Sequence, residues 1–189
     1  MKIFQVDSFT DKPFKGNPAG VCLLEKERPD SWMQDVAMEM NLSETAFLLK
    51  IKKGFNLRWF TPKIEVSLCG HATLASAHIL WEEKILNKEE PAIFNTKSGE
   101  LTCKKIGDWI AMEFPLRLVT PMEPSNVLLS ALNLDKKDIK CYVYDDNKDR
   151  LFLIELPSEE MVKKLTPDFV KLKEENVIIV MVTAKSSIK

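Results

Sequence analysis

The segment at residues 70–83 predicts a helix without a polar face. Its sequence, GHATLASAHILWEE, spreads small and apolar side chains around most of the helix circumference. These residues are Ala72, Leu74, Ala75, Ser76, Ala77, Ile79 and Leu80. A helix that is apolar on nearly all sides is buried on nearly all sides. Because the segments before and after it read as strands, we expect a sheet curled around one central helix.

The rest of the first part of the chain predicts an α+β fold. Strands and helices do not alternate regularly, which argues against a βαβ arrangement. A capping box, Ser31-Trp-Met-Gln34, predicts the start of a helix that runs to about Met40. Strands are predicted at residues 3–7, 19–24, 45–51, 57–61, 92–96, 101–105 and 109–114.

Two prolines, Pro115 and Pro121, bracket a predicted linker. We therefore expect one domain at residues 1–115 and the start of a second at residues 116–189. The second part predicts helices at residues 125–132 and from Ser158, and strands at residues 140–144, 151–156 and 177–183. The last of these strands, VIIVMVT, is so apolar that an uncovered sheet face there would favour association with another surface.

The charges of the chain are balanced, with 27 Lys and Arg against 28 Asp and Glu and a net charge of -1. Nucleic-acid-binding proteins carry a basic patch or stripe, so we expect no nucleic acid partner. Hydrophobic residues make up 45% of the chain and charged residues 29%, which is typical of a soluble globular protein and excludes intrinsic disorder.

No apolar run approaches the roughly 20 residues that span a bilayer, so we expect no membrane partner. The start of the chain, MKIFQVDSFTD, alternates apolar and polar residues and does not resemble a secretory signal. The four cysteines are widely spaced and form neither a CxxC pair nor a disulfide framework. We therefore expect a cytoplasmic protein.

Cys69, Gly70 and His71 stand at the predicted start of the central helix. The free N–H groups of a helix N-terminus suit an anion such as a carboxylate. A thiol at this position is expected to have a lowered pKa and could act as a proton-transfer base or a nucleophile. His71 could bind substrate or shuttle a proton. The ordinary interpretation of these residues alone is a packing cysteine beside a turn glycine, followed by a histidine that caps the helix.

The histidines do not predict a metal site. His71 and His78 are two helical turns apart, about 10.5 Å, which is too far for them to share one ion. His78 and Glu82 could chelate an ion, but a hydrogen-bonded surface pair is the ordinary alternative. We expect no metal.

Glu44 and the loop Gly16-Asn17-Pro18-Ala19-Gly20 are two further candidates. Glu44 precedes an apolar strand, a position from which a partly buried carboxylate could act as a general base. A solvated turn residue fits the same pattern. The loop could grip a substrate through its backbone N–H groups, or it could form an ordinary hairpin turn. The residues alone therefore predict an anion pocket at one buried helix and no defined reaction.

Four segments of the chain together resemble the phenazine-biosynthesis PhzF-like family. Their order and spacing agree with that family as well as their content. The resemblance is strong over residues 1 to about 115 and continues more weakly to about residue 185. The segments are FKGNPAGVCLLE at residues 14–25, MNLSETAFL at 40–48, LRWFTPKIEVSLCGHATLASAHIL at 57–80 and TKSGELTC at 96–103.

The resemblance implies a diaminopimelate-epimerase-like fold. Such a fold has two similar lobes, each a curled, mostly antiparallel sheet around a central helix, with the active site in the cleft between them. It also implies a homodimeric isomerase that transfers a proton on a small-molecule substrate without a cofactor. The anion-binding helix ends suggest a small carboxylate as substrate.

The resemblance also implies roles for particular residues. Glu44, in SETAF, matches the catalytic acid/base, and His71, in CGHAT, matches a residue that lines the site and assists proton handling or substrate binding. Asn17, Gly70 and Ala72 match positions near the substrate. Cys69 occupies the place where related racemases carry a thiol base, and here it would be a vestigial thiol.

One departure from the family is expected to matter. The second lobe of the family supplies a segment of the form EDPxTGSA, and these 189 residues contain no such segment and no glycine after Gly107. We therefore expect an incomplete second lobe that lacks half of the site. Besides the isomerase, this leaves a non-catalytic binding or interaction protein, or a degenerate gene product, as an alternative. A thiol-dependent amino-acid racemase or epimerase that uses Cys69 is a further alternative.

Overall fold

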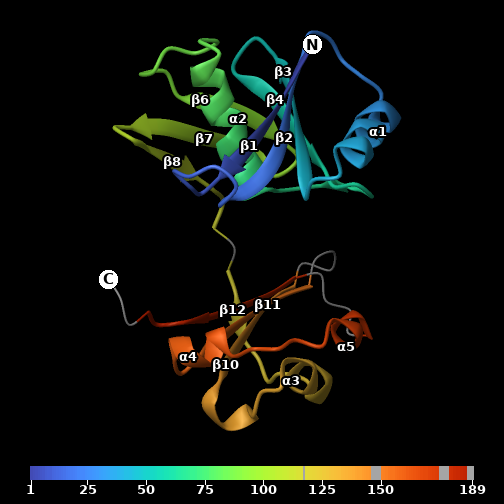
Figure 1. Ribbon diagram of the computed structural model, residues 1–189, viewed down its shortest axis with the longest axis vertical. Helices are drawn as coiled ribbons and strands as arrows, with labels where there is room; N and C mark the ends of the chain where they lie inside the picture. Colours follow the sequence, from blue (N-terminus) through green and yellow to red (C-terminus); the bar gives the residue numbers. More distant parts are fainter. Residues whose placement is uncertain (117, 146–149, 175–178, 187–189) are drawn as a thin grey trace. The chain divides into compact units, whose positions relative to one another are not determined.

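The central helix, α2, spans Gly70–Glu82 and is enclosed by the curled sheet of one compact unit of the computed structural model, Met1–Pro115 (Figure 1). Nine of its thirteen residues are buried, so the prediction of a helix buried on nearly all sides is confirmed. Ala72, Ala75 and Ala77 are fully buried. The structure describes residues 1–116, 118–145, 150–174 and 179–186.

The sheet of the first unit runs in the order β1-β2-β3-β4-β6-β7-β8, with β5 paired to β4. Among the described residues, β2 pairs with β3 and β4 with β6 in parallel, and the other pairs of this sheet are antiparallel. The mostly antiparallel, curled sheet is therefore confirmed. The strands are β1 (Lys2–Ser8), β2 (Asn17–Leu24), β3 (Glu44–Lys50), β4 (Phe55–Phe60), β5 (Glu65–Val66), β6 (Ala92–Thr96), β7 (Gly99–Ile106) and β8 (Trp109–Glu113).

The main core lies between this sheet and α2. Each strand alternates its side chains between the two faces of the sheet, so one apolar set points towards the helix. The set includes the fully or almost fully buried side chains of Val21, Leu48, Leu57, Trp59, Phe94 and Leu101. This packing holds the first turn of α2 against the ends of β2 and β3.

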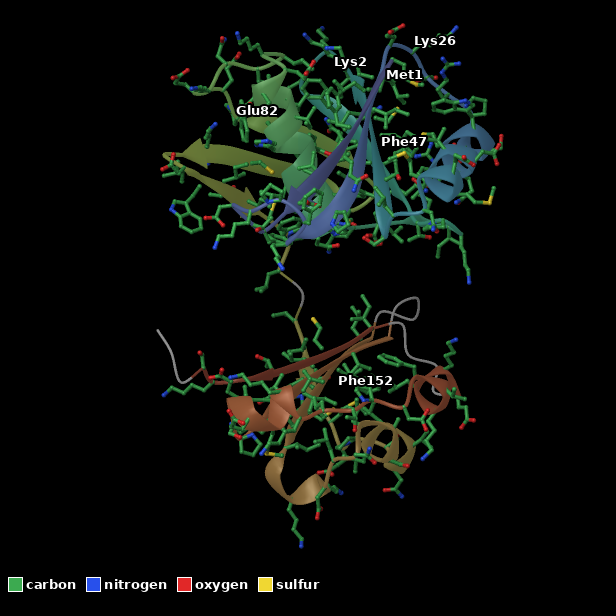
Figure 2. All side chains as sticks on the ribbon, in the orientation of Figure 1. Met1, Lys2, Lys26, Phe47, Glu82 and Phe152 are labelled. Carbon is green, nitrogen blue, oxygen red and sulfur yellow. The ribbon has the colours of Figure 1, made fainter. Side chains whose placement is uncertain are left out.

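Helix α1 (Asp30–Met40) packs on the other face of the sheet, where Phe47 lies (Figures 1 and 2). The Phe47 ring packs edge-on against Trp32 and Phe60, with ring centroids 6.2 and 5.6 Å apart. The capping-box prediction is wrong, because the helix begins at Asp30 after Pro29 and has no side-chain cap. Pro29, whose ring fixes φ, is the last residue before the helix and has an extended ψ. The Asp30 carboxylate in the first turn interacts favourably with the partial positive charge at the helix N-terminus.

The second unit, Leu116–Lys189, has a sheet in the order β12-β11-β10-β9. Phe152 lies in the core of this unit with Leu128 and Ile154 (Figure 2). On β12, Val180 and Val182 pack against this core, whereas Ile179 and Met181 on the opposite face are 48% and 47% exposed. The elements are β9 (Thr120–Pro121), α3 (Asn126–Leu132), the 3-10 helix η1 (Lys136–Asp138), β10 (Lys140–Asp145), β11 (Arg150–Leu156), α4 (Glu159–Lys163), α5 (Phe169–Glu174) and β12 (Ile179–Ala184).

Three predictions for this part need correction or restriction. Pro121, expected to mark the end of a linker, belongs to the short strand β9 that pairs with β10. The helix predicted from Ser158 ends after five residues at Lys163, and the separate helix α5 follows. Residues 177 and 178 of the last predicted strand lie outside the described residues. No helix in the described ranges is long and apolar enough to cross a membrane.

Candidate active site

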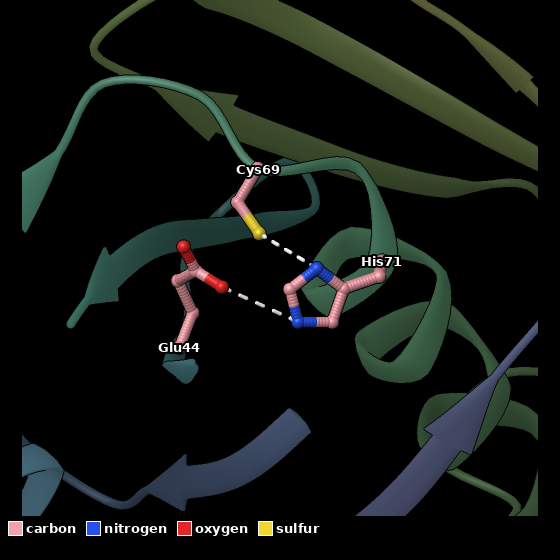
Figure 3. A group of neighbouring side chains, drawn as sticks. All are labelled: Glu44, Cys69 and His71. Carbon is pink, nitrogen blue, oxygen red and sulfur yellow. Dashed lines mark hydrogen bonds and ion pairs between the residues drawn. The ribbon is translucent and has the colours of Figure 1, made fainter. Parts of the chain in front are cut away.

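Glu44, Cys69 and His71 lie together at the first turn of α2 (Figure 3). Glu44 is the first residue of β3, Cys69 is the N-cap residue of α2, and His71 is the second residue of the helix. One carboxylate oxygen, the thiol sulfur and one imidazole nitrogen all lie within 4.8 Å of one another. The predicted acid/base and the two predicted helix-start residues therefore form one cluster.

The imidazole of His71 is the centre of this cluster. Its Nε2 lies 3.4 Å from Oε2 of Glu44 and 3.2 Å from Oγ of Ser43. Its Nδ1 lies 3.4 Å from Sγ of Cys69. The side chains of His71 and Glu44 are 9% and 21% exposed, so the imidazole is enclosed while the carboxylate remains accessible.

Backbone and hydroxyl contacts hold the helix start in place. Cys69 has an extended backbone, with φ -147° and ψ 120°, and the helix begins at the following glycine. The Thr73 hydroxyl donates to the Cys69 carbonyl at 2.5 Å. The Ser8 hydroxyl, from the end of β1, donates to the His71 carbonyl at 2.7 Å. Segments far apart in the sequence therefore position the imidazole.

The expectation of a lowered pKa for the Cys69 thiol is wrong. Burial is the largest influence and raises the pKa of this thiol to about 12, and the nearby Glu44 carboxylate acts in the same direction. The backbone N–H groups of Ala72 and His71 act in the opposite direction, as a helix N-terminus does, but they do not compensate for the lost hydration. At neutral pH the group is therefore a thiol and not a thiolate.

Burial also lowers the pKa of His71. The Glu44 carboxylate and the Pro18 carbonyl both favour the protonated imidazole, but they are weaker than the desolvation. The imidazole is therefore neutral at pH 7, with one N–H donor and one acceptor nitrogen.

The spacing of the three side chains is compatible with a shared metal ion, although the sequence predicts none. The sulfur of Cys69 lies at Nδ1 of His71 and the carboxylate of Glu44 lies at Nε2. One ligand atom from each of the three side chains nevertheless lies within 4.8 Å of the other two, close enough for one ion to contact all three. The absence of a metal stays a prediction.

The other predicted site residues lie nearby on the same elements. Asn17 begins β2 and is exposed, two residues before Ala19, which pairs with Glu44. Gly70 is the first residue of α2, and a Cβ atom added to it would meet no atom within 4 Å. Ala72 is fully buried and reaches the cluster through its backbone N–H near Cys69. The exposed side chain of Asn17 and the open space beside Gly70 thus lie at the same end of the sheet as the cluster of Glu44, Cys69 and His71.

Residues 6–189 match the sequence profile of a family described as phenazine biosynthesis-like protein. The chain belongs to this family. An uncharacterized isomerase from Halalkalibacterium halodurans is 48% identical over 188 residues, which cover 98% of this chain and 68% of the relative. The human phenazine biosynthesis-like domain-containing protein is 40% identical over 197 residues, which cover 98% of this chain and 66% of the relative.

Solved structures of the phenazine biosynthesis-like family share the fold. A putative PhzC/PhzF protein from Clostridium difficile superimposes with a TM-score of 0.83 and 36% identity, over 98% of this chain and 69% of the other. A PhzF-family protein from Enterococcus faecalis gives a TM-score of 0.80 and 38% identity, over 97% of this chain and 69% of the other. The chain thus spans about two thirds of the length of these relatives, and they support an isomerase-type function.

The sequence patterns missed two residues of this phenazine biosynthesis-like protein that contact His71. Ser43 contacts Nε2, and Ser8 donates to the backbone carbonyl. Ser43 could have been suspected, because it directly precedes Glu44 in the SETAF segment. Ser8 carries no local signal, because it lies 63 residues from His71 in the chain.

The lowered pKa of His71 predicts that acid destabilises the first unit partly through this residue. In the unfolded chain the imidazole takes up a proton near pH 6.5, whereas the folded unit resists that proton. This contribution to the free energy of unfolding is therefore present above about pH 6.5 and is lost as the pH falls towards the lowered pKa of the folded state. Urea unfolding from about pH 7.5 to about pH 5 should show a shallower pH dependence for His71→Gln than for the wild type. His78→Gln is the matched histidine control, and identical slopes for wild type and His71→Gln would contradict the prediction.

Proposed function

We propose that this chain forms the greater part of a cofactor-independent isomerase that moves a proton on a small carboxylate-bearing metabolite. Glu44 is the acid/base in this proposal. Its carboxylate accepts a proton from a substrate carbon and returns it to a different position, so that the isomer formed has the same atoms as the substrate. The observation that carries the proposal is the contact between the accessible Glu44 carboxylate and the enclosed, neutral His71 imidazole.

The position of Glu44 suits proton transfer. Its backbone belongs to the first residue of β3, which is held between β2 and β4, while part of its side chain reaches solvent. A general base must be rigidly held and within reach of the carbon acid. The paired strand supports the first condition, and the partial exposure of the side chain supports the second. Oε2 of Glu44 faces His71. In this proposal the other carboxylate oxygen of Glu44 exchanges the proton with the substrate.

Substrate recognition is assigned to the start of α2. A helix of thirteen residues directs free N–H groups and a partial positive charge towards an anion at its N-terminus. The open space at Gly70 leaves room for a carboxylate beside these groups. Asn17 can add an amide donor from the start of β2. Donors to a substrate carboxylate also stabilise the negative charge that develops when an adjacent C–H bond loses its proton.

The thiol-dependent racemase is less well supported. A thiol base has to be a thiolate for part of the time at working pH, and burial raises the pKa of Cys69 to about 12. The Glu44 carboxylate beside it further opposes a second negative charge on the sulfur.

Deuterium incorporation tests the proposed function. The purified protein is incubated in D2O with a panel of small cyclic and amino-acid-like carboxylates, and each compound is then analysed by mass spectrometry. We expect one class of compound to gain deuterium at a carbon, because the proton on Glu44 exchanges with solvent before it is returned. A compound that binds the protein in a thermal-shift assay but gains no deuterium and no isomer would favour a non-catalytic binding protein.

A further inference from the structure

The two ring nitrogens of His71 face groups with different hydrogen-bonding capacity. At Nε2 lie the Glu44 carboxylate, 3.4 Å away, and the Ser43 hydroxyl, 3.2 Å away. At Nδ1 lies the Cys69 sulfur, 3.4 Å away (Figure 3). The Glu44 carboxylate only accepts hydrogen bonds, as does the Pro18 carbonyl that also acts on this ring, whereas a thiol has one proton to donate. Since a neutral imidazole carries one proton, these neighbours decide which nitrogen holds it.

Two arrangements of the protons fit the contacts. In the first, Nε2–H donates to Glu44 and the Cys69 S–H donates to Nδ1. In the second, Nδ1–H donates to the sulfur, the S–H donates to Glu44, and the Nε2 lone pair accepts from Ser43. The second arrangement leaves that lone pair facing the carboxylate at 3.4 Å, where burial weakens the screening of the repulsion. The first arrangement is attractive at both nitrogens.

The first arrangement requires Cys69 to be protonated, and its surroundings meet this requirement. The side chain is buried, with only 7% of the residue exposed. Burial raises the pKa of the thiol to about 12, and the Glu44 carboxylate, which competes with Nδ1 as an acceptor for the S–H, acts in the same direction. Cys69 therefore remains an S–H donor over the whole neutral range.

We propose that Cys69 is a positioning residue, whose S–H donates to Nδ1 of His71 and holds the imidazole as the Nε2–H tautomer that donates to Glu44. The relevance of this tautomer to catalysis rests on the proposed role of Glu44 as the acid/base. The Nε2–H group holds Oε2 of Glu44 towards the ring and leaves the other carboxylate oxygen to exchange protons with the substrate. Cys69 forms no bond to the substrate and remains a thiol.

Long-range ¹H–¹⁵N NMR of protein labelled with ¹⁵N-histidine tests this proposal without a substrate. The chain contains two histidines, so the signals that remain in a His78→Gln variant belong to His71. For the wild type we expect Nδ1 to resonate far downfield, as an unprotonated ring nitrogen does, and Nε2 to resonate upfield as a protonated one. The ring protons distinguish the two nitrogens, because Nε2 couples to both of them and Nδ1 mainly to one.

Two substitutions at Cys69 separate donation from packing. Cys69→Ala removes the donor, so the Nε2–H tautomer should lose population. The averaged Nδ1 signal should then move upfield and the Nε2 signal downfield. Cys69→Ser retains an O–H donor and should restore the wild-type pattern. Cys103→Ala removes another buried thiol of the same unit and should leave the His71 signals unchanged.

The spectra can overturn the proposal in two ways. A wild-type spectrum in which Nδ1 carries the proton contradicts it, whether or not any variant folds. A folded Cys69→Ala variant with wild-type His71 signals contradicts it too, because the tautomer would then not depend on the thiol. Failure of the proposed function has a different signature, in which His71 shows the expected tautomer but no carboxylate exchanges deuterium.

Discussion

Glu44→Gln should reduce deuterium incorporation into the substrate by about 10²–10⁴-fold, the usual contribution of a general acid/base. Glutamine keeps the length of the side chain, and its amide oxygen can still accept from Nε2 of His71, but it cannot take up a proton from carbon. The loss should appear in the rate of exchange and not in substrate binding. The measurement is the initial rate of deuterium incorporation for a carboxylate that the wild-type protein exchanges.

A matched control is needed, because any glutamate substitution changes the net charge. Glu113→Gln makes the same change at a side chain that is 69% exposed, at the end of β8. We expect its exchange rate to equal that of the wild type. If Glu44→Gln retains exchange within a few-fold of the wild type while it remains folded, Glu44 is not the acid/base.

Phe94→Ala should lower the free energy of unfolding of the first unit by about 3–5 kcal/mol. Phe94 is fully buried in β6 and lies opposite Phe55 and Leu101, which are themselves 4% and 1% exposed. These neighbours belong to strands that are paired on both sides, so they cannot collapse far into the cavity left by the ring. Domains of this size commonly have a free energy of unfolding of only about 5–15 kcal/mol, so the variant should lose a large part of its stability.

Urea unfolding followed by tryptophan fluorescence measures this change, because all four tryptophans of the chain lie in the first unit. Phe14→Ala is the control, since the Phe14 residue is 94% exposed, and it should change the stability by less than about 0.5 kcal/mol. A loss below about 1 kcal/mol for Phe94→Ala would mean that the core around α2 is less tightly packed than its burial indicates.

The fold of the first unit could be predicted from sequence because its strongest signals are local. The all-round apolar composition of residues 70–83 requires burial, and burial of a helix among strands requires a curled sheet. Signals of one or two residues were less reliable. The Ser31 capping box failed because Pro29 had already started the helix. The two-residue strand β5 (Glu65–Val66) was missed because two residues are too few to show an alternating pattern.

The site was only partly predictable. Glu44 and His71 follow from the SETAF and CGHAT segments, but their 3.4 Å contact arises because β3 and α2 pack together. The helix N-terminus suggested a lowered pKa for Cys69, and the structure gives a raised one. The homodimer and the cytoplasmic location stay predictions.

Local pattern was sufficient for the elements that depend on neighbouring residues: the central helix, most strands, and the motif residues Glu44 and His71. The protonation states of Cys69 and His71 required the folded chain. They depend on how much water the surrounding strands remove and on which atoms then face each group. For His71 those atoms include the Glu44 carboxylate and the Pro18 carbonyl, which packing brings to the ring from other strands in ways that no short pattern encodes.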